Sequence, residues 1–147
     1  MNFTKPFLEW LLKSDYVKEN KLFLNAIQAE NNNIGVVTQQ ISRKDVKHFV
    51  DGSKWYKVTF TVFDYKSISF NGLVSTLLKN NENIEDLMDV QKIIDYVESA
   101  PDYPYFGDKY EVQAVYPAYL TPSTPTIDNS LGRYSVPIVC EVFESGK

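Results

Sequence analysis

The 147-residue sequence predicts an α+β fold, with a mostly antiparallel sheet and helices packed on one face. Helix-like and strand-like patterns follow in the order helix, strands, hairpin, helix, strand pair. An Asp-Gly pair separates two strand-like segments, as in a tight β-hairpin. There is no internal repeat, and no linker is long enough to divide the chain. We therefore expect one domain over residues 1–147.

Composition and charge limit the possible classes of partner. The chain is 44% apolar and contains nine Phe and ten Tyr, enough large side chains to build one core. Fifteen basic residues oppose nineteen acidic ones without forming a long basic block, so no specific nucleic-acid partner is expected. No apolar run approaches the roughly 20 residues that span a bilayer. We expect a soluble protein with no membrane partner.

The N-terminal segment has the spacing of an amphipathic helix over residues 3–14. The pattern is carried by Phe3, Phe7, Trp10, Leu11 and Ser14. Pro6 falls in the first turn, where its missing amide does little harm. Residues 21–28 are apolar and suit a strand or a short helical extension. The turn at residues 31–33 precedes an expected strand over residues 34–40.

The clearest local pattern is a β-hairpin. Residues 45–50 and 54–65 flank Asp51-Gly52-Ser53, and Asp-Gly supplies the positive backbone angles of a tight turn. In the second strand one face should point into the core; it holds Tyr56, Val58, Phe60 and Val62. The opposite face should meet solvent or a neighbouring subunit; it holds Trp55, Lys57, Thr59 and Thr61.

A second helix and a pair of strands complete the predicted domain. The helix begins with Asn83 as its cap, has Glu85 and Asp86 in its first turn and ends at Ala100-Pro101. Strands are expected over residues 110–116 and 133–144, joined by a Pro-, Thr- and Asn-rich connector. Pro137 lies inside the last strand and cannot donate a ladder hydrogen bond, so we place it at an edge or a bulge.

The inventory of reactive side chains predicts a protein that is not an enzyme and takes no cofactor. His48 is the single histidine, and Cys140 is the single cysteine, inside an apolar run typical of a buried thiol. An acyl-transfer enzyme would need His48 as general base beside Cys140 or a serine. Neither a nucleophile elbow nor a phosphate-binding loop is present in the sequence.

Two further clusters each have a functional and a structural interpretation. Glu82, Glu85, Asp86 and Asp89 share a helical face, but they lack calcium-loop spacing and are better explained by the helix dipole than by a metal. The aromatic string Tyr103-Pro104-Tyr105-Phe106 has only Lys109 as a basic companion. Packing or a protein interface is therefore favoured over base stacking.

Three stretches resemble one protein family in their overall pattern and in their local sequence. They are the hairpin running into Phe63-Asp64-Tyr65-Lys66-Ser67, the helix over residues 83–97, and the strand, loop and strand from Val112 to Ile138. Together they resemble the tail-terminator, or minor capsid, family of siphophages and related prophages, from about Asp45 onward. Pro137 departs from the expected pattern, because it puts uninterrupted pairing of the last strand in doubt.

The resemblance implies a structural protein of the virion, without catalytic or metal site, assembled in the host cytoplasm at the head-proximal end of the tail. Its copies would form a homo-oligomeric ring, a hexamer, that caps the major tail tube protein and docks the head-tail connector protein. A two-faced sheet, an edge-like last strand and long polar loops suit such lateral association. A neck or head-completion protein on the portal side is the main alternative, and a small adaptor or an acyl-transfer enzyme is less favoured.

We expect the ring interface to use the loop over residues 121–132, which would otherwise be a solvated connector, together with aromatic residues elsewhere. The predicted interface residues are Thr121, Pro122, Thr124, Pro125, Ile127, Asp128, Leu131, Trp55, Tyr105 and Phe106.

Overall fold

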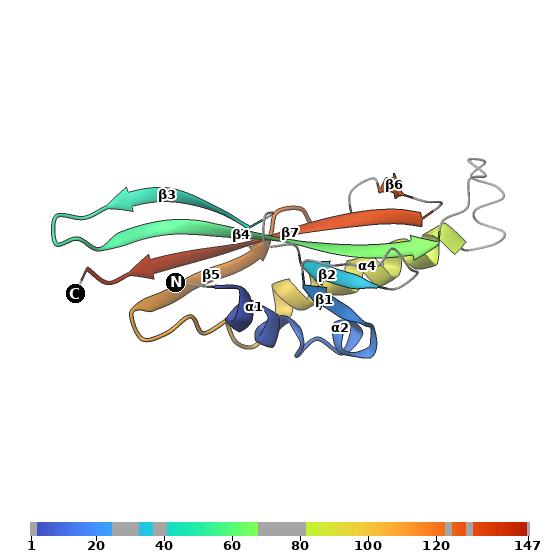
Figure 1. Cartoon of the computed structure of the whole chain (residues 1–147), viewed down its shortest axis with the longest axis horizontal. Helices are drawn as coiled ribbons and strands as arrows, with labels where there is room; N and C mark the ends of the chain where they lie inside the picture. The colour runs from blue at the N-terminus through green and yellow to red at the C-terminus, as the bar shows by residue number, and fades with distance from the viewer. Residues whose placement is uncertain are drawn as a thin grey trace.

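The computed structural model describes residues 3–24, 33–36, 41–67, 82–122, 125–128 and 131–146, without the side chains of residues 67, 82–84 and 128. A seven-stranded sheet forms one layer, and the helices lie on one of its faces (Figure 1). The predicted α+β class, with a mostly antiparallel sheet in one domain, is confirmed.

Two long strands form the spine of the sheet. Strands β4 (Lys54–Ser67) and β7 (Leu131–Glu144) pair antiparallel through 14 aligned positions with no shift in register. At about 3.3 Å per residue, this ladder is about 45 Å long. The sheet order is β1-β2-β4-β7-β5, with β3 also on β4 and β6 also on β7. Each long strand therefore has different short partners at its two ends.

The short strands divide the sheet into two halves. At one end β3 (Ser42–His48) and β5 (Tyr110–Pro117) extend the ladder on either side. At the other end lie β2 (Ile34–Val36), β1 (Leu22–Leu24) and β6 (Thr126–Asp128). Among the described strands, all pairings are antiparallel except β1 with β2.

Three described helices cover the core face. The predicted helix over residues 3–14 is correct in its first two thirds: α1 spans Thr4–Leu11, and a second helix, α2, spans Asp15–Glu19. Ser14 separates them because its backbone is extended, with ψ of 127°. A five-residue helix is too short to leave a periodic pattern. Helix α4 (Glu82–Ser99) includes Asn83, so Asn83 is not its cap as predicted.

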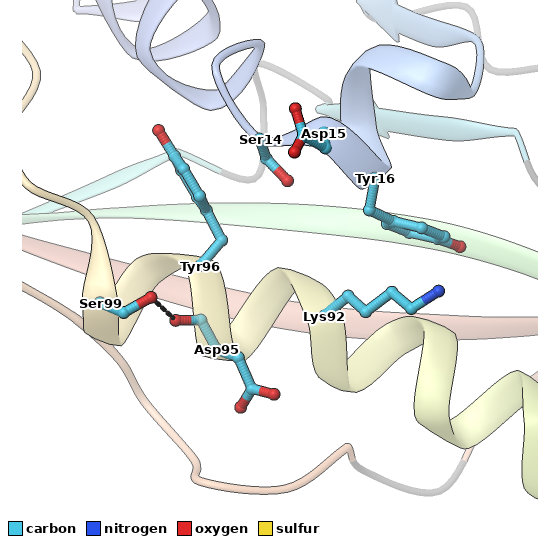
Figure 2. Close-up of a pocket in the computed structure, with 7 residues that line it drawn as sticks. All are labelled: Ser14, Asp15, Tyr16, Lys92, Asp95, Tyr96 and Ser99. Carbon is cyan, nitrogen blue, oxygen red and sulfur yellow. Dashed lines mark hydrogen bonds between the residues drawn. The ribbon is translucent and has the colours of Figure 1, made fainter.

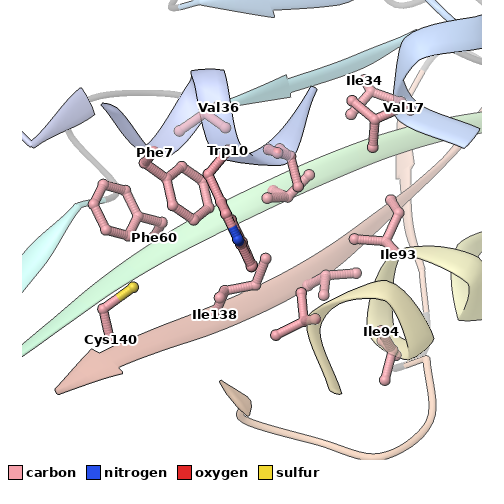
Figure 3. Packing of buried hydrophobic residues seen from close by; sticks show 14 of the residues in the cluster. Phe7, Trp10, Val17, Ile34, Val36, Phe60, Ile93, Ile94, Ile138 and Cys140 are labelled. Carbon is pink, nitrogen blue, oxygen red and sulfur yellow. The ribbon is translucent and has the colours of Figure 1, made fainter. Parts of the chain in front are cut away.

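The core lies between the helices and the inner face of the two long strands (Figure 3). The ring of Phe7 stacks on that of Phe60 with centroids 3.9 Å apart, which joins α1 to β4. The predicted inward residues of β4, namely Tyr56, Val58, Phe60 and Val62, are all buried. Trp55, Lys57, Thr59 and Thr61, on the opposite face, are half-buried. The predicted two-faced strand is confirmed.

The placement of the last strand corrects two expectations. Strand β7 lies between β4 and β5, so it is an interior strand and not an edge. Pro137 pairs with Thr61 in an unshifted ladder, so it marks no bulge there. The Pro137 carbonyl accepts a hydrogen bond from the Ala118 N–H, just after β5 ends. The N–H that proline lacks would face the same neighbouring strand, β5, at the point where the β5–β7 pairing stops. Proline is tolerated because no ladder donor is required.

The connector before β7 also differs from expectation. Residues 126–128 form strand β6, which pairs with residues 131–133 of β7 and so belongs to the sheet. Strands β1 and β2 cover residues 22–24 and 34–36 of their predicted ranges, while residues 25–28 and 37–40 lie outside the described residues.

Among the described helices, none combines the length and apolar character needed to cross a membrane.

Candidate interaction surface

The hairpin of β3 and the start of β4, residues 42–54, forms what we call the hairpin arm. All seven residues of β3 are exposed, so this strand contributes no side chain to the core. Figure 1 shows the arm projecting past α1 at one end of the molecule. Backbone pairing with β4 holds it, and the Arg43 guanidinium lies 3.8 Å from the centroid of the Tyr56 ring. This strand is therefore held by backbone pairing and not by side-chain packing in the core.

The tip of the arm is apolar and tightly held. Val50 is fully exposed, and Phe49 is 39% exposed. The Phe49 N–H donates to the Ser53 carbonyl at 2.8 Å, and the Gly52 N–H donates to the Phe49 carbonyl at 3.1 Å. Gly52 has φ of +88°, the left-handed geometry that the Asp-Gly pair predicted. The tip is therefore an apolar turn closed by two backbone hydrogen bonds.

Contacts from the C-terminal end of the chain support this turn. The Phe143 ring lies 5.9 Å from the Phe49 ring in an edge-on arrangement. The Gly146 N–H donates to Ser53 Oγ at 3.2 Å. A Cβ on Gly146 would lie 2.4 Å from the Asp51 carbonyl oxygen, so only glycine fits this close approach. The end of β7 thus braces the arm.

A groove lies on the helix side of the sheet, between α1 and the segment after α4. Its volume is about 250 Å³, and we call it the aromatic groove; it is lined by Pro6, Glu9, Trp10, Lys13, Asp102, Tyr103, Pro104 and Tyr105. Trp10 Nε1 donates to the Asp102 carbonyl at 2.9 Å, and Lys13 pairs with the Asp102 carboxylate at 2.5 Å. Tyr103 and Tyr105 remain 49% and 67% exposed. These bonds fix the segment to α1 and leave two aromatic rings at the surface.

A buried polar network joins α2, β4 and α4. Lys66 and Asp64 are fully buried in β4 with Nζ and Oδ2 3.9 Å apart. Tyr16 donates to Asp64 Oδ2 at 2.7 Å, while Lys66 Nζ lies 3.2 Å from Asp89 Oδ2. Lys92 pairs with the second oxygen of Asp89 at 3.1 Å. Buried charges survive only when paired, and here the pairs connect three elements.

The network shifts its carboxyl groups in opposite directions. Burial raises the pKa of Asp64 to about 6, although the Lys66 charge and the Tyr16 hydrogen bond favour ionisation. Burial would also raise the pKa of Asp89, but the hydrogen bond from Lys92 and the charge of Lys66 hold it below its usual value. Of the two carboxyl groups, Asp64 thus has the pKa nearer neutrality.

A shallow depression between α2 and α4 adjoins this network (Figure 2). Lys92 lies on its wall, already paired with Asp89. Asp95 accepts a hydrogen bond from Gln91 at 2.9 Å, and the Ser99 hydroxyl donates to the Asp95 carbonyl at 2.7 Å. Lys92 and Asp95 of this depression are engaged within the protein, and its lining has no exposed aromatic ring such as Tyr103 or Tyr105 of the aromatic groove.

The histidine and the cysteine lie apart. His48 pairs with Lys54 at the arm, whereas Cys140 pairs with Val58, about 13 Å further along β4. Cys140 is fully buried, and burial raises the pKa of its thiol to about 12. These two side chains cannot form a nucleophile–base pair. Among the described residues, no group of three or more His, Cys, Asp or Glu is placed to hold a metal ion.

The structure distributes the predicted interface residues over several environments. Tyr105, Thr121 and Ile127 are exposed. Trp55, Pro122, Pro125 and Leu131 are half-buried. Thr124 lies outside the described residues, and for Asp128 only the backbone, in β6, is described. The set does not form one patch, because Trp55 lies at the arm end of the ladder and Leu131 at the opposite end.

The prediction that Phe106 belongs to the interface is wrong. Phe106 is buried, with its ring centroid 4.9 Å from that of Phe3 and 6.3 Å from that of Phe60. Within the aromatic string, the chain direction turns Phe106 into the core while Tyr103 and Tyr105 face outward. The sequence pattern does not distinguish the buried Phe106 from the exposed Tyr103 and Tyr105, because all three residues are aromatic neighbours in the chain.

The arm tip was not among the predicted interface residues. Phe49-Val50 directly before Asp51-Gly52 is the sequence feature that identifies it, because a turn faces solvent and apolar residues beside it are exposed. The Asp64–Lys66–Asp89 network has no such feature, since Asp89, in α4, is far in the chain from Asp64 and Lys66 of β4.

Comparison with protein-family models finds no match to this sequence. A search of curated proteins finds no significant match either. Functional proposals therefore rest on the residues of the chain itself.

Proposed function

We propose that this chain is a non-enzymatic assembly subunit whose copies form the ring that terminates the tail of a long-tailed bacteriophage. The observation that carries self-assembly is the hairpin arm, a braced strand pair with an apolar tip that takes no part in the core. Exposed apolar surface on an ordered projection is typical of a protein–protein contact. The phage setting comes from the resemblance of residues 45–138 to tail terminators.

The remaining surface agrees with a role in binding rather than catalysis. Tyr103 and Tyr105 present aromatic rings, the residue type enriched at protein interfaces, beside α1. Strand β6 places the exposed side chain of Ile127 at the end of the sheet opposite the arm. A subunit with contact surfaces at both ends and one side suits a position between a tube, a connector and neighbouring copies.

Deletion of the gene in the phage or prophage that encodes the chain tests this proposal. Loss of a terminator should give over-long or headless tails by electron microscopy, and the wild-type protein supplied in trans should restore normal ones. Phe60→Ala, a core variant, serves as a control for loss through misfolding. Normal tails without the protein would contradict the proposal.

Copy number separates a terminator from related virion proteins. A terminator should be present as a single ring per tail, far below the number of tube subunits. Quantitative mass spectrometry of purified tails measures the ratio, and a value near one to one would identify a tube protein instead. A cryo-EM map that places the ring on the portal side would identify a neck protein.

A further inference from the structure

The arm and the rest of the chain carry opposite charge. Residues 42–54 contain four Lys or Arg and two Asp, whereas the whole chain has fifteen Lys or Arg and nineteen Asp or Glu. The arm is therefore net basic on a protein whose remainder is strongly acidic. This distribution favours contact between the arm of one copy and the body of another.

The aromatic groove offers a complement to the tip in shape and polarity. Its exposed rings, Tyr103 and Tyr105, flank a concave surface floored by Trp10, and Val50 with Phe49 is a convex apolar point. At the groove Asp102 is paired with Lys13, Glu9 lies 3.9 Å from the Lys5 ammonium, and Asp108 accepts a hydrogen bond from the Tyr105 hydroxyl. The groove therefore offers the tip mainly aromatic surface, and the charge complement to the basic arm is the acidic remainder of the chain.

A chain cannot fill its own groove with its own tip. In Figure 1 the arm extends away from α1, and the Phe49–Phe143 contact and the Gly146–Ser53 hydrogen bond hold the tip on the end of the ladder. An arm tip that enters this groove must therefore come from another copy of the chain.

Extension of the sheet from copy to copy is less favoured than insertion of the tip. Both edge strands at the arm end are irregular: β3 shifts register between Asp45 and Lys47, and β5 shifts between Val112 and Ala114. Bulges and edge lysines such as Lys44 obstruct pairing with a further strand. A side-chain contact through the tip avoids both obstacles.

We propose that the Phe49–Val50 tip of one copy inserts into the aromatic groove of a second copy, head to tail. Tip and groove are different surfaces, so each bound copy leaves one of each free, and the contact propagates until it closes a ring. The inference rests on the proposed function for its ring geometry, and it assigns the partner of the arm to a second copy of this chain.

Disulfide trapping between two purified, differently tagged full-length variants tests the contact. Val50→Cys mixed with Tyr103→Cys should give a mixed dimer under mild oxidation, and the buried Cys140 stays out of the reaction. Val50→Cys mixed with Glu98→Cys, at an exposed position of α4, is the matched control. Cross-linking no stronger than the control, or Val50→Cys homodimers as the main product, would overturn the proposal.

Sedimentation of unmodified protein provides an independent readout. Concentration-dependent association should weaken by at least about tenfold for Val50→Ser, as for loss of an interface anchor. Its melting curve should match wild type, since Val50 is fully exposed. Association unaffected by this change, or monomers throughout with no cross-link, would overturn the proposal.

Failure of the contact and failure of the phage role have different results. Head-to-tail cross-links together with normal tails in the gene deletion would overturn the terminator and leave the contact standing. Restoration of normal tails by Val50→Ser, with no cross-link between tip and groove, would overturn the contact and leave the terminator role standing. Cross-linking of Val50→Cys to a tube protein in purified tails, and not to its own copies, would also overturn the contact.

Discussion

The same two strands run through two regions that are stabilised differently. Around Phe60 and Val62, β4 packs against α1, and its inward side chains are almost completely buried. Beyond Tyr56 the strand enters the hairpin arm, where its partner β3 is exposed along its whole length. Burial of apolar area stabilises the first region, whereas backbone pairing, a left-handed glycine and one aromatic contact hold the second. Changes in the first should therefore affect folding, and changes in the second should affect association.

The largest expected effect is on the core face. Phe60→Ala should lower the free energy of unfolding by about 3–5 kcal/mol, because it removes a ring stacked on Phe7 and leaves a cavity. Val58→Ala should cost less, in keeping with its smaller side chain. Thr59→Ala and Thr61→Ala, on the half-buried face, should cost under about 1 kcal/mol. Urea denaturation of the four variants decides; equal losses would show that both faces are packed.

Next in size is the pH dependence from Asp64. Its pKa in the folded protein is about 6, above the unfolded value of about 3.9. A raised carboxyl pKa contributes stability that is present below about pH 4 and is lost as pH rises through about 6. Relative to Asp64→Asn, wild type should lose up to about 3 kcal/mol between pH 4 and pH 7.

Denaturation at several pH values measures this difference, with Glu98→Gln on the exposed side of α4 as control. Subtracting the variant from wild type separates Asp64 from Asp89, whose lowered pKa acts with the opposite sign. A constant difference between wild type and Asp64→Asn across this range would contradict a titrating Asp64.

A smaller effect is expected at the turn of the arm. Gly52→Ala should destabilise by about 1–2 kcal/mol, since φ of +88° is strained for a residue with a Cβ. Hydrogen exchange should quicken in residues 47–55 while the amides of β4 near Phe60 stay protected. If exchange quickened equally in both places, the arm and the helix-backed half would form a single cooperative unit.

The smallest expected effect on stability is at the tip itself. Val50→Ser should change the free energy of unfolding by less than about 0.5 kcal/mol, because Val50 is fully exposed. Thermal melts in parallel with Phe49→Ala sharpen the comparison, since Phe49 contacts Phe143 and should cost about 1 kcal/mol. A large loss for Val50→Ser would show that the tip packs against the rest of the chain.

The sequence pattern predicted those elements whose conformation is set by residues that are neighbours in the chain. The Asp51-Gly52 turn, the alternating faces of β4 and the amphipathic spacing of α1 follow from backbone sterics and from periods of 2 and 3.6 residues, which the sequence displays directly. The fold class followed from the order of these elements. The break between α1 and α2 did not follow from the pattern, because a single extended residue, Ser14, makes it.

Tertiary structure alone decided which elements meet. β7 became an interior strand because β4 and β5 both pair with it, and Pro137 is accommodated because β5 ends there. Phe106 entered the core through its contacts with Phe3 and Phe60, and Asp64, Lys66 and Asp89 were brought together from two elements. The sequence determines local conformation through each residue's own sterics, whereas these outcomes depend on long-range packing, in which a residue's partners are distant in the chain.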